Sequence, residues 1–281
     1  MKNKSILLML LSALSFSSMQ IIVKLLTKIP LMEKVFFRNF VSLILAYVVI
    51  KKNKLRFFGL KENRKRLFYR SVFGYLGVIL FFYATSQMLA ADAAMLNKLS
   101  PIFVAILAHL LLKEKIKKIN ICALVISFAG AWLVIKPQLN LSVIPAAAGL
   151  LSAAVSGAAY IFITDIGKKE SIYTIVFYFS VFSVICSIPF IIFSFAIPNL
   201  YELTMLLLLG ALAALGQIAL TYAYKSSEAS DISIYDYTNI IFSSVLGYIF
   251  LSELPDLYSI IGGALIIAAS IIVFIYNKRN N

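Results

Sequence analysis

The sequence predicts an all-α polytopic membrane protein with ten transmembrane helices, arranged as two inverted five-helix repeats. Three observations lead to this prediction. Hydrophobic residues make up 62% of the 281 residues and charged residues only 14%, whereas soluble globular domains carry about 25% charged residues. Apolar stretches of about 20 residues, long enough to cross a bilayer, recur from one end of the chain to the other. The two halves of the chain also share a pattern at an offset of 139 residues.

Five helices are expected in the first half. The first follows a basic tip and resembles a signal peptide, but its apolar part of about 20 residues is longer than a usual signal core, and no soluble domain follows. The turn KIPLMEK, the basic loop KKNKLRFFGLKENRKR, Asp92 and the segment KEKIKK mark the boundaries of the next four. The expected helices span residues 5–27, 33–50, 67–90, 92–112 and 118–136.

Five further helices are expected in the second half. The segment KPQLN precedes a helix that is dense in Ala, Gly and Ser, which indicates close helix–helix packing in a membrane. The polar turns GKKES, IPNLYE, KSSEASD and SELPD introduce the remaining four. These helices are expected at residues 142–165, 171–196, 201–224, 230–251 and 256–276.

The basic residues predict the orientation of the chain. With the N-terminus on the inner side, the two chain ends and the segments between helices, counted with the basic stretch 51–70 that includes Arg70, place 20 of the 26 Lys and Arg residues inside and three outside. This asymmetry follows the positive-inside rule. We therefore expect a multi-pass protein of the cell (plasma or inner) membrane with both termini in the cytoplasm. The three basic residues that remain within helices are Lys24, Arg38 and Lys98.

The same composition argues against several classes of partner and cofactor. The net charge of +14 is spread over short segments between apolar runs and forms no nucleic-acid-binding face. Cys122 and Cys186 each lie inside an apolar run and His109 is the sole histidine, so neither a disulfide, a metal site nor another cofactor is expected. The chain contains no GxxxxGK[ST] motif, so ATP is not expected to supply energy directly.

The repeat is the strongest sign of function. Sliding the chain by 139 residues aligns 83–114 with 222–253 without a gap, pairing Tyr83 with Tyr222 and the acidic residues Asp92 and Glu114 with Asp231 and Glu253. The acidic matches fall at helix boundaries and favour a duplication, with repeats at 1–139 and 140–281. Because each repeat holds an odd number of helices, the second enters the membrane from the opposite side. Inverted repeats are typical of secondary transporters, whose substrate site lies near the midplane.

Two segments carry a family resemblance: SPIFVAILAHLLLKEKIKKINICALVISFAGAWLVI (100–135) and NIIFSSVLGYIFLSELPDLYSIIGGALIIAASIIV (239–273). They resemble the two EamA repeats of the drug/metabolite transporter (DMT) superfamily. The resemblance implies helices 1–4 and 6–9 around a central cavity, with helices 5 and 10 at the periphery. Pro101 matches the family's proline near the start of the fourth helix, and Glu114 and Glu253 match its acidic residues. Ile240 replaces that proline in the second repeat, which leaves open whether the fourth and ninth helices kink alike.

Lys98 is the first candidate site residue because it lies within the fourth helix. A lysine there either extends its head to the outer interface or faces a cavity. The second repeat favours the cavity, since Asp236 lies one position from Tyr237, the equivalent of Lys98. Two opposite charges at matching depth predict a site between the repeats.

Polar and aromatic neighbours extend this candidate site. Pro101 removes a backbone donor and frees the carbonyl of Asn97, which then needs another partner in a dry environment. Arg38, near the outer start of the second helix, is either an interfacial anchor or an anion-binding residue. Tyr83 and Tyr222 either form cavity walls or only pack. The full set of predicted substrate-binding or cavity residues is Lys98, Asn97, Ser100, Pro101, Tyr83, Asp236, Tyr237, Asn239, Tyr222 and Arg38.

These features predict a secondary transporter that moves a small polar metabolite, an amino acid or a related compound, by alternating access. The alternatives are a non-transporting membrane scaffold or sensor, and a transporter of drugs, cationic or nucleoside-like solutes. An enzyme is not expected, because no cluster of acid–base or metal-binding residues stands out. The expected partners are a small-molecule substrate and membrane lipids, without nucleic acid. Proton or ion coupling through Asp236, facilitated diffusion, the direction of transport and the oligomeric state stay open.

Overall fold

The computed structural model describes residues 2–100, 102–104, 106–107, 118–135, 143–166, 170–226 and 235–280. Within these ranges the chain forms ten α-helices and one short 3₁₀ helix and no β-strand. The first-half helices are α1 (Lys2–Leu25), α2 (Leu31–Lys52), η1 (Lys61–Asn63), α3 (Arg64–Gln87), α4 (Ala90–Asn97) and α6 (Lys118–Ile135). The second-half helices are α7 (Val143–Ile166), α8 (Ile172–Ser194), α9 (Leu200–Ser226), α11 (Thr238–Leu251) and α12 (Leu257–Asn280).

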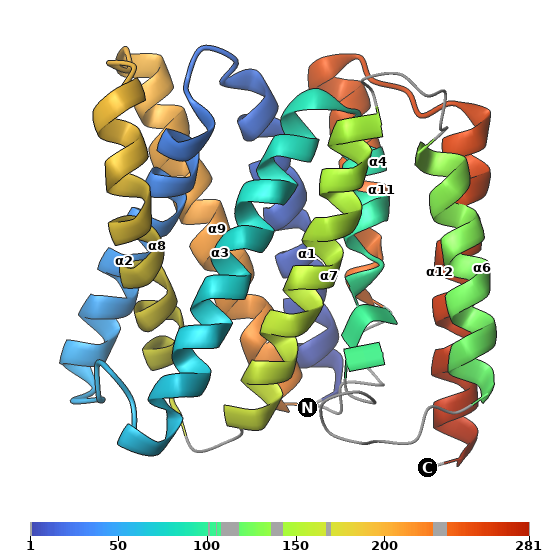
Figure 1. Cartoon of the computed structure of the whole chain (residues 1–281), viewed down its shortest axis with the longest axis horizontal. Helices are drawn as coiled ribbons and strands as arrows, with labels where there is room; N and C mark the ends of the chain where they lie inside the picture. Colours follow the sequence, from blue (N-terminus) through green and yellow to red (C-terminus); the bar gives the residue numbers. More distant parts are fainter. Residues whose placement is uncertain are drawn as a thin grey trace.

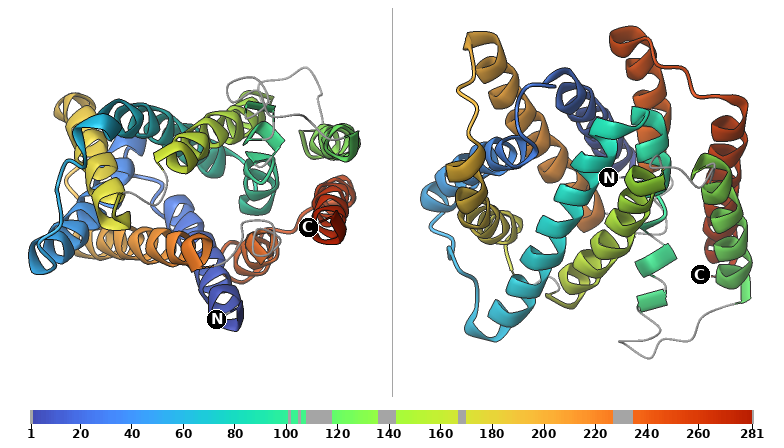
Figure 2. Two further views of the ribbon diagram at one scale, coloured as in Figure 1. Left: turned by 90° about the horizontal axis from the view of Figure 1, so that it is seen from below. Right: turned by 45° about the horizontal axis from the view of Figure 1, so that its top comes forward.

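The helices run roughly parallel or antiparallel to one another as a single bundle (Figure 1). The start of α1 and the end of α12 lie on the same side of this bundle. Helices α6 and α12 pack against each other at one edge of the bundle (Figure 2). Their contact is close because a Cβ atom at Gly130 of α6 would lie 2.6 Å from the carbonyl oxygen of Gly262 of α12. Such small-residue contacts allow helix backbones to approach in lipid.

The prediction of an all-helical membrane protein is confirmed. Six helices in the described part of the chain are long and apolar enough to cross a bilayer, and two shorter apolar helices, Ile121–Ile135 and Thr238–Leu251, accompany them. The six spans are Lys4–Leu25, Lys61–Gln87, Val143–Ile163, Ile172–Ser194, Leu200–Ala223 and Leu257–Tyr276. Helix α2 is as long as these but carries charged residues at both ends and Arg38 within it.

The predicted fourth and ninth helices differ from the observed ones. The sequence predicts one continuous helix over 92–112, but α4 ends at Asn97 and the chain turns at Lys98 and Leu99. The described residues after this turn, 100, 102–104 and 106–107, are helical again. The proline at position 101 has no N–H to donate to the carbonyl of Asn97, which weakens a continuous helix at this point. Helix α11 begins at Thr238, after a turn at Tyr237 that interrupts the predicted helix 230–251, and residues 235 and 236 before the turn are helical. Residues 230–234 lie outside the described ranges.

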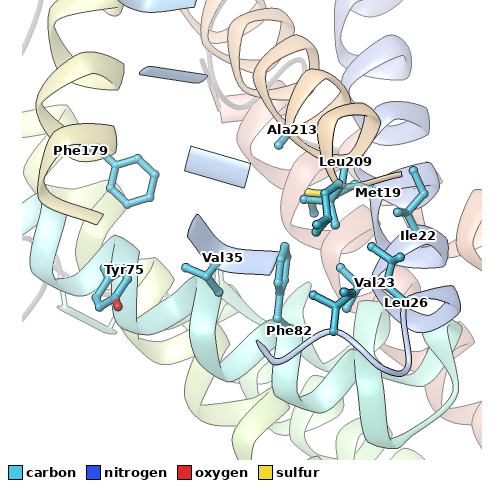
Figure 3. Packing of buried hydrophobic residues seen from close by; sticks show 12 residues of the cluster. Met19, Ile22, Val23, Leu26, Val35, Tyr75, Phe82, Phe179, Leu209 and Ala213 are labelled. Atoms are coloured by element: carbon cyan, nitrogen blue, oxygen red, sulfur yellow. The ribbon is translucent and has the colours of Figure 1, made fainter. Parts of the chain in front are cut away.

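A cluster of apolar side chains fills the bundle at the end opposite the start of α1. It joins the end of α1, the start of α2, the end of α3 and the start of α9 (Figure 3). Val35, Phe82, Leu206 and Leu209 are almost completely buried in it. These apolar side chains occupy the interior of the bundle on that side. The cluster's buried members are Met19, Ile22, Val23, Leu26, Ile29, Val35, Tyr75, Phe82, Phe179, Leu206, Leu209 and Ala213.

Candidate functional site

A cavity of about 110 Å³ lies at the centre of the bundle. Its lining comes from α1, α2, α3, α4, α7, α8, α9 and α11 or from the turns that adjoin α4 and α11. Neither α6 nor α12 contributes to the described lining, as the family resemblance implies for helices 5 and 10. The lining residues are Phe16, Met19, Gln20, Arg38, Arg70, Gly74, Gly77, Val78, Phe81, Phe82, Asn97, Lys98, Ser156, Ala159, Tyr160, Phe179, Gln217, Leu220, Asp236 and Asn239.

Lys98 and Asp236 form an ion pair in this cavity. The Lys98 Nζ atom donates to the Asp236 Oδ2 atom at 2.7 Å, and the two side chains are 10% and 19% exposed. Each residue lies at an interruption of regular helix, Lys98 directly after α4 and Asp236 just before α11. Interrupted helices at the midplane commonly carry the substrate and ion sites of transporters, because they present backbone groups and helix ends to the cavity.

Asn239 lies beside this pair but its side chain is occupied by a link between α1 and α11. Its Nδ2 atom donates to the carbonyl oxygen of Ala13 at 3.0 Å and to Ser17 Oγ at 2.6 Å. Ser243 extends the link by donating to Gln20 Oε1 at 3.0 Å. Buried polar groups of this kind hold membrane helices together. The arrangement favours a structural role for the Asn239 amide.

Asn97 links α4 to α7 in a similar way. Its Nδ2 atom donates to Ser152 Oγ at 3.1 Å, and Ser152 Oγ donates to the carbonyl oxygen of Gly149 at 2.6 Å. Asn97 also lines the cavity next to Lys98. It therefore holds the end of α4, and with it the lysine, against the second half of the chain.

Two arginines occupy another part of the cavity wall. The guanidinium carbon of Arg70 lies 4.0 Å from the ring centroid of Phe179, and that of Arg38 lies 5.7 Å from the same centroid. Only 7% of Arg38 and 5% of Arg70 is exposed. Arg38 Nη1 donates to Asn39 Oδ1 at 2.9 Å. Contact with an aromatic face stabilises a guanidinium by cation–π attraction, but it uses none of its N–H donors.

The remaining predicted residues lie elsewhere. Ser100 and Tyr237 are buried, 7% exposed each, and are not among the described residues that line the cavity. Tyr237 packs in an apolar cluster with Leu96 and Leu99. Tyr222 is 40% exposed and its hydroxyl lies 3.3 Å from that of Tyr173, outside the described cavity lining.

Tyr83 and Pro101 complete the predicted set. Tyr83 is half-buried and is absent from the described lining, whereas Phe81 and Phe82 beside it belong to that lining. Pro101 lies outside the residues that the structure describes. The structure thus brings Lys98, Asn97, Asp236, Asn239 and Arg38 together around one cavity.

Arg70 is the main functional candidate that the sequence interpretation missed. Its place after a run of basic residues groups it with the inner basic stretch 51–70, yet it is the seventh residue of α3. A signal for its position exists in the sequence. Arg70, Gly74, Gly77 and Phe81 follow one another at spacings of four, three and four residues, which places them on one face of a helix.

The cavity lining provides charged groups that could bind a polar solute. The described lining contains three cationic side chains, Arg38, Arg70 and Lys98, and one anionic side chain, Asp236. Among the described residues, no group of three His, Cys, Asp or Glu side chains could hold a metal ion. The cavity therefore offers an ion pair, two guanidinium groups and aromatic walls to a solute.

Known proteins share the sequence pattern and the fold of this chain. The EamA-like transporter family matches residues 3–136 and 144–275. A pseudopaline exporter of Pseudomonas aeruginosa is 33% identical over 272 residues, which cover 96% of this chain and 95% of the exporter. An S-adenosylmethionine uptake transporter of Rickettsia bellii is 28% identical over 96% of this chain and 93% of its own. A crystal structure that shares only 13% identity superposes over the full length of both chains with a TM-score of 0.70, which shows a common fold.

Proposed function

The chain belongs to the EamA-like transporter family of the DMT superfamily, and from this premise we propose that it moves a small polar metabolite across the cell membrane by alternating access through the central cavity. Members of this family are transporters and not enzymes, so a small-molecule substrate and a position in a membrane follow from the family itself. The substrate class, an amino acid or a related compound, and the alternating-access mechanism are the parts that we propose.

The ion pair between Lys98 and Asp236 is the observation that carries the proposal. It joins a residue of the first half to one of the second half inside the cavity. Both residues adjoin helix interruptions, where polar groups can be offered to a solute. A charge within the membrane is costly and usually marks a substrate or ion path. We propose that Lys98, Asp236 and Asn97 form the centre of the substrate site.

We further propose that residues 1–139 and 140–281 are inverted repeats that move against each other. The apolar cluster between α1, α2, α3 and α9 closes one side of the cavity. On the same side, Lys24 pairs with Glu253 and donates to the carbonyl oxygen of Met88 at 2.7 Å, and Glu253 accepts from the backbone N–H of Ala90 at 3.0 Å. With both termini in the cytoplasm, this closed side is the outer one, and the turn between α3 and α4 is the outer gate.

The proposal concerns the substrate path and not its direction. The relatives named above are an exporter and an uptake transporter, so one architecture serves both directions. Pseudopaline and S-adenosylmethionine are the substrates that those names give, and both names fit a small polar metabolite. Proton coupling through Asp236 and facilitated diffusion are equally compatible with the site.

Transport of a metabolite pool by reconstituted protein tests the proposal. Proteoliposomes loaded with a cytosolic metabolite extract, and protein-free liposomes loaded in the same way, are incubated in buffer, and released compounds are identified by mass spectrometry. We expect a small set of polar metabolites to cross only in the presence of protein. Equal release from both preparations, under imposed proton and sodium gradients as well as without them, would contradict the proposed function.

A further inference from the structure

The buried arginine pair points to a particular chemical class of substrate. Resting on the proposed function, we propose that Arg38 and Arg70, held against Phe179, form an oxyanion-binding subsite that takes a carboxylate or phosphate group of the transported solute. This subsite is separate from the Lys98–Asp236 pair, because each arginine contacts Phe179 of α8 and neither forms an ion pair with a described acidic residue. The solute is therefore a small organic anion, or a zwitterion whose anionic end lies at the arginines.

Unused hydrogen-bond donors are the first argument. Both arginines are more than nine-tenths buried and line the cavity. Within the described part of the chain, Arg38 Nε, Arg70 Nε and Arg70 Nη1 have no hydrogen-bond partner. A buried charged donor without a partner costs free energy, whereas a bidentate oxyanion can satisfy two guanidinium N–H groups at once. The unpaired donors therefore favour the binding of a carboxylate or phosphate beside the arginines.

The balance of charge is the second argument. The Lys98 ammonium is compensated by Asp236 at 2.7 Å. No such partner accompanies the two guanidinium groups in the described lining, so the cavity carries an excess of two positive charges. Contact with the Phe179 ring reduces this cost but leaves the charges in place. An anionic group that enters the cavity lowers the electrostatic free energy, and a cationic solute without an anionic group raises it.

Gly74 leaves the space that the Arg70 guanidinium needs to lie against the Phe179 ring. A Cβ atom at Gly74 would lie 2.8 Å from Arg70 Nη1 and 3.1 Å from Phe179 Cε2. The glycine one turn after Arg70 thus allows the guanidinium to lie along α3 and reach the ring on α8. Three helices, α2, α3 and α8, together fix the subsite, which limits the entropy lost when an anion binds.

Stabilisation of the purified wild-type protein by simple probes tests the subsite without any variant. Apparent melting temperature is measured with sodium succinate, sodium phosphate, succinamide and sodium chloride, with ionic strength matched among the salts and the succinamide sample. A ligand that binds only the folded protein raises this temperature as its concentration exceeds its Kd. We expect succinate, phosphate or both to stabilise the protein more than chloride and succinamide do. The larger of the two responses identifies the preferred group.

Substitutions test whether the stabilisation by anions depends on Arg38 and Arg70. Arg38→Gln and Arg70→Gln should each weaken the apparent affinity for the stabilising anion about 10- to 100-fold, the loss expected for a charge-assisted hydrogen bond. Arg56→Gln changes an exposed arginine of the 51–63 segment and should leave the apparent affinity for the anion unchanged. Gly74→Ala keeps both arginines and should still weaken the response by crowding Arg70. Gly247→Ala, where the nearest atom would lie 3.6 Å from the new Cβ, is its control.

The outcomes separate this inference from the function on which it rests. Equal shifts with succinate, phosphate and chloride in the wild-type protein overturn the subsite, and so does an anion response that survives Arg38→Gln and Arg70→Gln. If either arginine variant fails to fold, the wild-type probes and the Gly74→Ala comparison still decide. Protein-dependent release of only metabolites that carry neither a carboxylate nor a phosphate group would leave the transport function standing and remove the oxyanion subsite.

Discussion

Lys98 and Asp236 show how a membrane protein can carry opposite charges in its interior. An isolated ammonium group at the centre of a bilayer costs at least about 2.5 kcal/mol on insertion scales. Here the ammonium lies 2.7 Å from a carboxylate and both groups border a cavity. Each group therefore offsets the desolvation of the other, and the loss of either leaves an uncompensated charge.

We predict that Lys98→Met and Asp236→Asn each impair transport and lower the melting temperature, and that the double variant loses less than the two single losses combined. Neighbouring charges of this kind show coupling free energies of about 0.5–3 kcal/mol. Transport of the metabolites that the wild-type protein moves, together with thermal unfolding of the four proteins, measures this coupling.

The same cycle can contradict the proposed site. Additive losses would show that the two residues act independently. Normal transport by Lys98→Met would mean that the lysine only pairs with Asp236 and is not needed by the substrate. Lys61→Met, in an exposed position of η1, provides the matched control for removal of a lysine charge.

At the scale of the helices, the proposed site lies where the helical structure is interrupted, at the end of α4 and at the start of α11. Backbone groups at the end of α4 and the start of α11 are not all satisfied within their own helices. The other end of α4 has a partner of its own, because Glu253 accepts from the N–H of Ala90, the first residue of α4. Lys24, near the end of α1, pairs with the same carboxylate. Three helices are thereby tied together where the outer gate is proposed.

We predict that Glu253→Gln and Lys24→Met open this gate more often. If each variant removes about 1–2 kcal/mol of free energy that stabilises the closed gate, the population of the open gate rises about 5- to 30-fold. The reporter is a cysteine at Val78, which lines the cavity, in a chain whose Cys122 and Cys186 are replaced by serine. Its labelling by a membrane-impermeant thiol reagent added outside the cell should accelerate in both variants.

Lys28→Met is the control for the gate, since Lys28 is exposed and lies four residues beyond Lys24. Labelling that is unchanged in Glu253→Gln and Lys24→Met would show that these contacts do not hold the outer side closed. Acceleration by all three lysine and glutamate variants alike would point to surface charge and not to the tie between helices.

For the whole molecule, the helices divide into those that surround the cavity and those that lie at the edge of the bundle. Eight helices or their adjoining turns surround the cavity and carry its polar groups, whereas α6 and α12 pack on each other at one edge of the bundle (Figure 2). The beginning of α1 and the end of α12 share one side (Figure 1). The strongly basic segments of the sequence predict that this side faces the cytoplasm.

We predict that equivalent segments of the two halves lie on opposite sides of the membrane. The offset of 139 residues carries the α2–α3 connection onto the α8–α9 connection, which includes Ile197, 86% exposed. In the cysteine-free chain, Ile197→Cys should react with an impermeant reagent in intact cells, and Lys61→Cys only after permeabilisation. Reaction of both from the same side would remove the inverted repeat, and exchanged reactivity would reverse the orientation.

The class of the molecule, eight of its helices and the charged pair follow from the residues alone. Long apolar stretches leave helices as the main way to satisfy the backbone in lipid, so eight predicted helices agree with the observed ones to within a few residues. Asp236 was placed opposite Lys98 because the repeat put two charges at one depth. These features follow from local composition or from internal similarity.

The packing of the helices against one another sets which side chains share the cavity, and the sequence alone does not reveal it. Arg70 looked like part of a basic loop, because position along the chain does not reveal how far a helix extends into the bundle. Tyr83 and Tyr222 are repeat equivalents, yet neither belongs to the described lining, since a small helical rotation moves a residue from the cavity wall to a neighbouring helix. Periodicity in the sequence specifies a face of each helix, but the packing of all the helices together determines what that face contacts.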